Sequence, residues 1–196
     1  WHELGEAAHA DFEAFSTPVE VTGAVNMSLC MQHLGEVMPA DAIVTNGAGN
    51  FAAWLHRFYR HRACRTQLAP TSGAMGYGWP AALAAKAVHS NREVICVAGD
   101  GDFMMTGQEM ATAVQHNIQT VVIVLNNGCW GAEKAYQRDF FSERYIGADI
   151  HSPSFDKVAE LYGAAGFRVD RIDALGEAVQ AALNCGKPAV IDVQVD

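Results

Sequence analysis

Short apolar runs alternate along the chain with longer segments of helical pattern. The apolar runs predict buried strands at residues 41–46, 92–98, 120–126, 167–172 and 188–195. The helical segments cover residues 25–37, 52–59, 73–89, 106–117, 152–163 and 174–185. Strands as apolar as these, separated by helices, are typical of a parallel sheet that is covered on both faces. The pattern therefore predicts an α/β fold with a doubly wound, mostly parallel sheet and helices on both faces.

Two local signals mark where helices are expected to begin. Thr106 and Glu109 have the spacing of a capping box, which would give Glu109 a structural role. Ser152 and Pro153 suit the N-cap and first turn of a helix that ends near Gly163.

The beginning of the chain differs in composition from the remainder. Residues 1–18 mix alanine, acidic and aromatic residues and stop at Pro18. We expect them to form a linker or arm that arrives from an upstream domain, because the chain starts with Trp1 and shows no signal-peptide pattern. Residues 19–196 are then expected to form a single domain.

Composition and charge exclude several classes of partner. The chain has 196 residues, half of them hydrophobic, and its 13 basic against 22 acidic side chains give a net charge of −9. This balance argues against nucleic acid and anionic membranes as partners, and no apolar run is long enough to span a bilayer. The five cysteines are scattered without a C-x-x-C pair, which favours reduced thiols in the cytoplasm.

Glycine-rich polar segments follow several of the predicted strands or open the predicted helices. They are "NGAGNF" (46–51), "SGAMGYGWP" (72–80), "GDGDF" (99–103) and "NNGCWG" (126–131). Ligands of open α/β sheets collect at the carboxyl ends of the strands, and free N–H groups at the start of a helix suit phosphate. A small-molecule substrate or cofactor that carries phosphate is therefore expected at this edge of the sheet.

Asp100 adds a constraint of charge to such a site. A diphosphate beside this carboxylate requires a cation between the two anions. Mg²⁺ prefers roughly six oxygen ligands, commonly one or two protein side chains together with phosphate. Asp100, an asparagine amide and a carbonyl of the following turn could supply the protein share.

These motifs resemble a known family. Gly99-Asp100-Gly101 followed after twenty-four residues by Asn126-Asn127 is similar to the thiamine diphosphate motif of acetolactate synthase-like and pyruvate oxidase-like enzymes. The segments "APTSGAMGYGWPAALAAKA" and "GDFMMTGQEMATAVQHNI" strengthen the resemblance, which covers most of residues 19–196. It implies the C-terminal, pyrophosphate-binding domain of such an enzyme, with thiamine diphosphate and Mg²⁺ as cofactors.

The resemblance also implies roles for individual residues. The side chains of Asp100 and Asn127 and the main-chain oxygen of Cys129 would bind Mg²⁺. Gly101 and Asp102 would meet the diphosphate, largely through backbone N–H groups. The remaining implied cofactor contacts come from two glycine-rich segments: Gly49, Asn50 and Phe51 toward the diphosphate, Gly73 toward the 4′-amino group, and Met75 beneath the bent cofactor.

The same resemblance implies that the catalytic machinery is incomplete in this chain. The glutamate that activates the cofactor comes from an amino-terminal domain across a dimer interface in this family, so no catalytic residue is assigned here. We expect the isolated chain to be inactive, and the full-length protein to be a homodimer or tetramer. The implied chemistry is decarboxylation, or C–C bond formation or cleavage, on 2-oxo acids or related carbonyl compounds.

The segment after the asparagines bears on substrate choice. Trp130 to Lys134, "WGAEK", resembles sulfoacetaldehyde acetyltransferases, which transfer an acetyl group to phosphate. Ala132, Glu133 and Tyr136 depart from the pattern of acetolactate synthases. Trp130, Glu133 and Lys134 are therefore the candidates for the substrate side of the site, with Lys134 suited to an anionic substrate.

Several alternatives remain open at this point. The domain could bind the cofactor without chemistry, Glu133 and Lys134 could lie on a solvated helix face, and the basic cluster 56–65 could be a solvated face or subunit interface. Met75 could serve packing, and Asn127 could cap a turn. Nicotinamide dinucleotide binding is disfavoured, because the glycine order in 73–78 is G-x-x-G-x-G.

Overall fold

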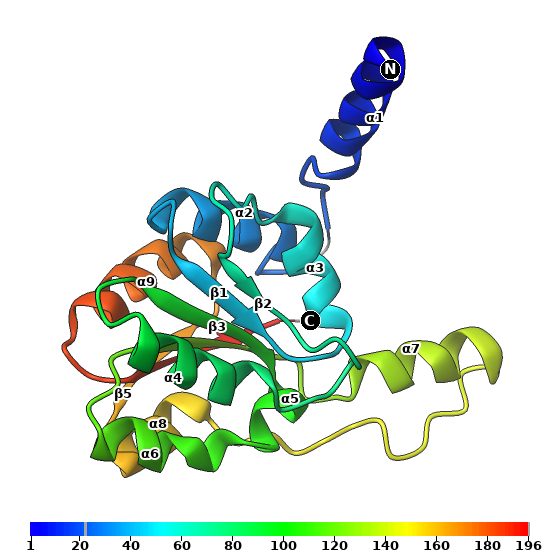
Figure 1. The fold of residues 1–196 in the computed structure, drawn as a ribbon. Coiled ribbons are helices and arrows are strands. Elements are labelled where there is room, and N and C mark those ends of the chain that lie inside the picture. The colour runs from blue at the N-terminus through cyan, green and yellow to red at the C-terminus, as the bar shows by residue number, and fades with distance from the viewer. Residues whose placement is uncertain (22, 196) are drawn as a thin grey trace.

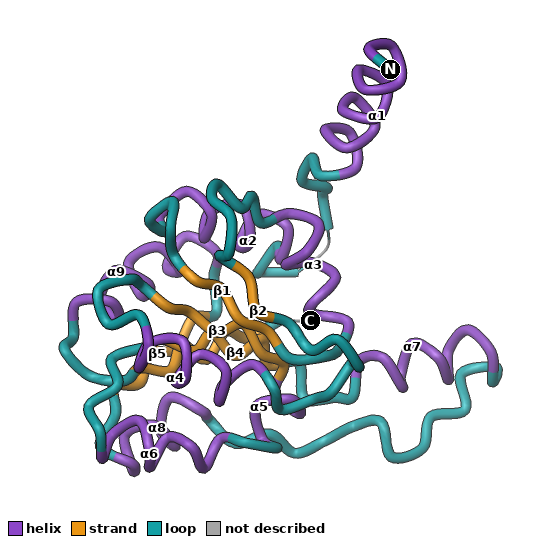
Figure 2. The backbone as a smooth tube through the Cα atoms, in the orientation of Figure 1, coloured by secondary structure: helices purple, strands orange, loops and turns teal. Residues whose placement is uncertain are grey.

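The computed structural model describes residues 1–21 and 23–195 and contains one parallel sheet between two layers of helices (Figures 1 and 2). The strand order is β2-β1-β3-β4-β6-β5, and every neighbouring pair is parallel. The strands are β1 (Ile43–Asn46), β2 (Gln67–Leu68), β3 (Val94–Gly99), β4 (Val121–Asn126), β5 (Ala165–Val169) and β6 (Ala189–Gln194). The predicted doubly wound α/β fold is confirmed.

The described part of the chain contains nine α-helices and two short 3₁₀ turns. The helices are α1 (His2–Phe15), α2 (Met27–Val37), α3 (Asn50–Phe58), α4 (Gly78–Val88), α5 (Asp100–Met104), α6 (Met110–Gln115), α7 (Gly131–Phe140), α8 (Phe155–Tyr162) and α9 (Leu175–Asn184). The 3₁₀ turns are Gly107–Glu109 and Ile172–Ala174. Among the described residues, no helix combines the length and apolar character that a membrane crossing needs.

Alternation along the strands sends successive side chains into two separate cores. Val44, Ile95 and Ile123 face one core, which α2, α3 and α9 close. Val94, Cys96 and other alternate positions face the second core, which α4, α5, α6 and α8 close. Because both faces are covered, the central strands β1, β3 and β4 are buried along their whole length.

The first helix stands away from the sheet as an arm (Figure 1). None of its residues is buried, and its last turn contacts the rest of the chain. Arg60 forms an ion pair with Glu13 at 3.0 Å, and the Arg57 guanidinium lies 4.3 Å from the centre of the Phe15 ring. Two members of the basic cluster 56–65 thus bind the arm.

Two predicted helix starts are wrong. The helix expected from residue 73 begins at Gly78, because Gly73 and Gly76 take φ values of +66° and +78°, which interrupt a right-handed helix. Thr106 makes no side-chain cap bond to the turn that follows it. Its hydroxyl instead donates to the Gly76 carbonyl at 2.8 Å, and Glu109 accepts from Thr112 at 2.8 Å.

The start of α8 also differs from the prediction. Ser154, not Ser152, precedes the helix, and Gly163 ends it in the left-handed conformation as expected, with a φ of +90°. The Ser152 hydroxyl donates instead to the Asp100 carboxylate.

Candidate functional site

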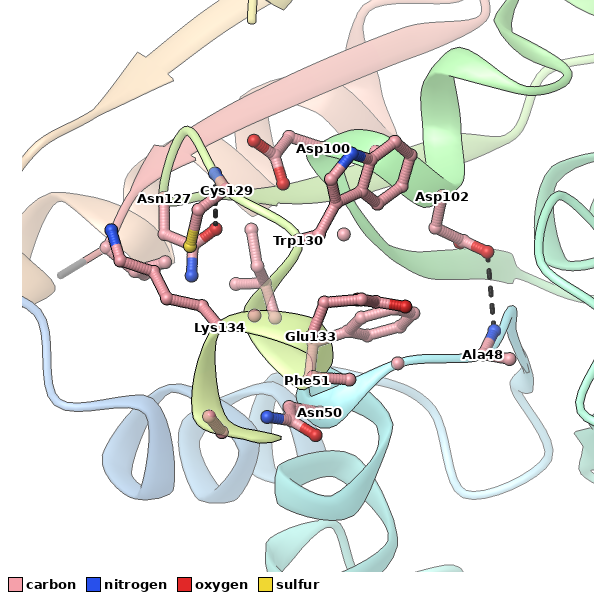
Figure 3. Close-up of a pocket in the computed structure, with 18 of the residues that line it drawn as sticks. Ala48, Asn50, Phe51, Asp100, Asp102, Asn127, Cys129, Trp130, Glu133 and Lys134 are labelled. Carbon is pink, nitrogen blue, oxygen red and sulfur yellow. Dashed lines mark hydrogen bonds between the residues drawn. The ribbon is translucent and has the colours of Figure 1, made fainter. Parts of the chain in front are cut away.

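The carboxyl ends of β1, β3 and β4 open onto one cavity of about 790 Å³ (Figure 3). These strands are neighbours in the sheet, and Gly99 at the end of β3 lies opposite Leu125 of β4. The cavity lining contains every site residue predicted from the sequence: Gly49, Asn50, Phe51, Gly73, Met75, Asp100, Gly101, Asp102, Asn127, Cys129, Trp130, Glu133 and Lys134. The fold therefore assembles in one place residues that are far apart in the sequence, whereas their individual roles remain predictions.

Asp100 is the first residue of α5 and is only 3% exposed. Its Oδ2 atom accepts two hydrogen bonds, one from the Gly128 N–H at 3.0 Å and one from the Ser152 hydroxyl at 2.6 Å. Within the described chain, no hydrogen bond reaches Oδ1. One oxygen of this carboxylate is held by the protein, and the other is available to a ligand in the cavity.

The turn after β4 brings Asn127 and Cys129 to the same side of the cavity as Asp100 (Figure 3). Asn127 Oδ1 accepts from the Cys129 N–H at 3.2 Å, and Gly128 between them has a φ of +65°. The side chain of Asn127 thus does cap this turn, as one alternative reading proposed. An amide oxygen has two lone pairs, so this bond leaves capacity for a second partner.

The main-chain oxygen of Cys129 takes no part in the backbone hydrogen bonds between this turn and residues 148–150. Cys129 forms an isolated antiparallel bridge with Asp149. The two hydrogen bonds of the bridge run from Trp130 to Ala148 at 2.7 Å and from Ile150 to Gly128 at 2.8 Å. Neither bond uses the Cys129 carbonyl, and no other backbone N–H of residues 1–21 and 23–195 donates to it, so that oxygen can accept from a ligand.

These three groups fit a hard divalent cation. No cluster of three or more His, Cys, Asp and Glu side chains suited to a metal occurs in residues 1–21 and 23–195. The candidate set is instead a carboxylate, an amide and a carbonyl, which are the oxygen donors that Mg²⁺ accepts alongside phosphate and water.

Asp102 points away from these groups and ties other loops of the site together (Figure 3). Its Oδ1 accepts from the Gly76 N–H at 2.7 Å and from the Ala48 N–H at 3.3 Å. Burial raises the pKa of this carboxyl to about 6, against the opposing effect of the two backbone bonds. A Cβ on Gly47 would lie 2.0 Å from Oδ1, so glycine is required beside this carboxylate.

The tie made by Asp102 connects the two ends of the predicted cofactor site. Ala48 precedes Gly49 and Asn50, which are predicted to contact the diphosphate, whereas Gly76 follows Met75 in the turn predicted to contact the aminopyrimidine. The resemblance assigned backbone contacts to Asp102. The structure adds a side-chain role that the sequence pattern did not indicate.

The three substrate-side candidates lie at different places around the cavity. The Trp130 ring covers Gly101 so closely that a Cβ on Gly101 would lie 2.2 Å from it, which puts Trp130 beside the predicted diphosphate turn. Lys134 forms an ion pair with Asp149 at 2.5 Å, and this hydrogen bond raises the Lys134 pKa. Glu133 is exposed on α7, a helix without buried residues. The ammonium of Lys134 is therefore already paired in this structure.

Asp192 contacts the strand end that leads into the asparagine turn, and it was not among the site residues predicted from the sequence. It is fully buried in β6, and its Oδ1 accepts from Asn126 at 3.1 Å and from Gln194 at 2.8 Å. Its Oδ2 accepts from the Phe155 N–H at 3.0 Å, and burial raises its pKa. An acidic residue inside the apolar run "PAVIDVQV" was the available signal.

Comparison with known proteins identifies the family. Residues 47–193 match the family model described as "Thiamine pyrophosphate enzyme, C-terminal TPP binding domain". The sulfoacetaldehyde acetyltransferase of Alcaligenes xylosoxydans xylosoxydans is 36% identical over 168 residues, which are 83% of this chain and 28% of that protein.

Acetolactate synthases are also similar to this chain. The enzyme of Mycobacterium bovis is 36% identical over 211 aligned positions, 97% of this chain and 34% of that protein. The isozyme 2 large subunit of Escherichia coli K12 is 30% identical over 175 residues, 88% of this chain and 32% of that protein. The chain thus spans about a third of the length of these relatives. It belongs to the thiamine diphosphate-dependent enzymes and contains their C-terminal cofactor-binding domain.

Proposed function

We propose that this chain anchors thiamine diphosphate through Mg²⁺ in an acetolactate synthase-like enzyme that acts on 2-oxo acids or related carbonyl substrates. The observation that carries the proposal is the meeting of Asp100, Asn127 and Cys129 at one side of one cavity. Since the chain corresponds to about a third of its relatives, the reaction of the whole protein is part of the proposal.

The proposed metal site uses oxygens that the protein leaves free. Asp100 contributes Oδ1, Asn127 its amide oxygen, and Cys129 its main-chain carbonyl. Backbone N–H groups of Gly101, Asp102 and residues 49–51 would donate hydrogen bonds to the diphosphate oxygens and so stabilise the remaining negative charge. Such N–H groups at a turn that enters a helix are suited to phosphate oxygens.

The other end of the cofactor is assigned to the turn that Asp102 holds. The Gly73 carbonyl would accept a hydrogen bond from the 4′-amino group, and Met75 would support the bent cofactor. When bound, thiamine diphosphate supplies the electron sink for breaking and forming bonds at a carbonyl carbon. The residues of this chain bind and orient it.

The activating glutamate is assigned to a part of the protein outside these 196 residues. We therefore expect no turnover of pyruvate or sulfoacetaldehyde by the isolated chain, and an assembly of two or four subunits in the cytoplasm for the active enzyme. Measurable turnover of either substrate by the isolated chain would contradict this assignment.

A second candidate function is acyl transfer of the sulfoacetaldehyde acetyltransferase type. It is favoured by 36% identity to such an enzyme and by the stretch Trp130 to Lys134. In this reading Lys134 exchanges Asp149 for an anionic substrate. Assay of the full-length protein on pyruvate and on sulfoacetaldehyde with phosphate distinguishes the two reactions. Cofactor binding without either reaction would instead indicate a non-catalytic binding module.

The metal site is tested by titrating thiamine diphosphate into the chain by calorimetry, with and without Mg²⁺. Asp100→Ala should lower the Mg²⁺-dependent affinity roughly 100-fold or more, because it removes the only carboxylate proposed as a ligand. Asp11→Ala, which removes an exposed carboxylate from α1, serves as the control and should bind like the wild type. Equal affinity in wild type and Asp100→Ala would remove the metal-site assignment.

A further inference from the structure

Ser152 contacts the proposed metal carboxylate from outside every motif of the family resemblance. Its hydroxyl donates to Asp100 Oδ2 at 2.6 Å, across 52 positions of sequence. Ser152 lies two residues before the N-cap of α8, which is Ser154 and which makes no side-chain cap bond. The hydroxyl of Ser152 is thus used for the site and not for the helix.

The contact fixes which oxygen of Asp100 faces the cavity. Both hydrogen bonds to the carboxylate, from Ser152 and from the Gly128 N–H, end on Oδ2. The two donors come from different segments, so together they define the rotation of the carboxylate. Oδ1 is left for the cation, and the side chain does not have to be ordered when the cation binds.

The segment that carries Ser152 is itself anchored on both sides. Before Ser152, the Ile150 N–H donates to the Gly128 carbonyl at 2.8 Å. After Ser152, the Phe155 N–H donates to the buried Asp192 at 3.0 Å. Asp192 also accepts from Asn126, the neighbour of the proposed ligand Asn127. The position of the hydroxyl is therefore set by the same elements that set the asparagine turn.

We propose that Ser152 is a positioning residue that presents the Asp100 carboxylate to the divalent cation. The inference rests on the proposed metal site and adds a residue that neither the sequence motif nor the family description assigns. Partners that orient a metal ligand commonly change metal affinity by roughly 10–100-fold when they are removed. The expected effect is on the affinity for Mg²⁺, and the fold is retained.

The test is a calorimetric titration of Mg²⁺ into the chain in the presence of saturating thiamine diphosphate. Ser152→Ala should weaken Mg²⁺ binding by roughly 10-fold or more. Ser152→Thr keeps a hydroxyl at the same place and should restore the affinity to within about threefold of wild type. Ser154→Ala removes an exposed serine hydroxyl two residues away and should have no effect.

Each outcome separates this inference from the proposal on which it rests. If Asp100→Ala loses Mg²⁺ binding while Ser152→Ala keeps the wild-type affinity, the positioning role is refuted and the metal site stands. If Ser152→Thr is as weak as Ser152→Ala, the hydroxyl is not the cause and the inference also fails. If the wild-type chain shows no Mg²⁺-dependent binding, the proposed metal site and the role of Ser152 are overturned together.

Discussion

Gly78→Ala is expected to lower the free energy of unfolding by about 3 kcal/mol, because the added methyl group meets backbone that cannot rotate away. A Cβ at this position would lie 2.7 Å from the Gly47 nitrogen and 2.8 Å from the carbonyl carbon of Asn46. The Gly78 carbonyl also accepts from the Thr45 hydroxyl at 2.8 Å. Helix α4 and strand β1 would have to separate, which breaks this bond and opens the core between them.

The same displacement should weaken cofactor binding. Gly47 begins the loop that carries the predicted diphosphate contacts, and the turn before Gly78 carries Met75. Moving α4 away from β1 therefore pulls the two ends of the site apart.

The measurement is urea unfolding followed by circular dichroism, with Gly5→Ala as a matched control. Gly5 lies in the exposed helix α1, and a Cβ there would have nothing within 4 Å. That substitution should leave the midpoint of the main transition unchanged. Equal midpoints for Gly78→Ala and Gly5→Ala would show that α4 and β1 do not approach as closely as described.

The fold could be predicted because its signals are local and repeated. Apolar runs separated by helical segments define a covered parallel sheet, and each of the five predicted strands forms. The two-residue strand β2 (Gln67–Leu68) was missed because it is exposed, short and without apolar alternation. Its pairing to Val44 and Thr45 is a tertiary contact, which no local pattern records.

Two of the errors at helix starts share one physical cause. Thr106 and Ser152 have the right residue type and spacing to cap a helix, yet each donates its hydroxyl to a distant partner. A capping bond contributes about 1 kcal/mol, so a tertiary partner of similar strength can replace it. Sequence spacing reveals the donor but not the acceptor that the fold brings to it.

In the site, too, the sequence predicts which residues come together but not the direction in which their side chains point. Residues at the carboxyl ends of neighbouring parallel strands must converge, so the cluster of Asp100, Asn127 and Cys129 followed from the motif. Chain direction does not determine where a side chain points. Asp100 faces the asparagine turn, whereas Asp102, two residues later, faces Ala48 and Gly76.

Asp102→Asn is expected to remove a loss of unfolding free energy of about 3 kcal/mol that the wild type undergoes between low pH and pH 7. Burial raises the pKa of Asp102 in the folded protein from 3.8 to about 6. Between these two values the folded state binds more protons than the unfolded state, so the wild type loses stability as the pH rises through this window. A shift of about 2 pH units corresponds to about 3 kcal/mol between low pH and pH 7.

Asparagine at position 102 removes this titration and keeps the acceptor. Oδ1 alone receives the bonds from Gly76 and Ala48, so an amide oxygen can hold both loops. The unfolding free energy of Asp102→Asn relative to wild type should therefore rise between about pH 4 and pH 7 by up to about 3 kcal/mol.

Urea unfolding across this pH range measures the difference directly. Other buried acids, such as Asp192, are present in both proteins, and their titration cancels in the comparison. Asp11→Asn, an exposed substitution on α1, should give a difference from wild type that does not vary with pH. If the curves of wild type and Asp102→Asn were parallel throughout, the carboxyl would keep its ordinary pKa in the folded state. Its burial between the Ala48 and Gly76 loops could not then be as close as described, because a carboxylate deprived of water there must be harder to ionise.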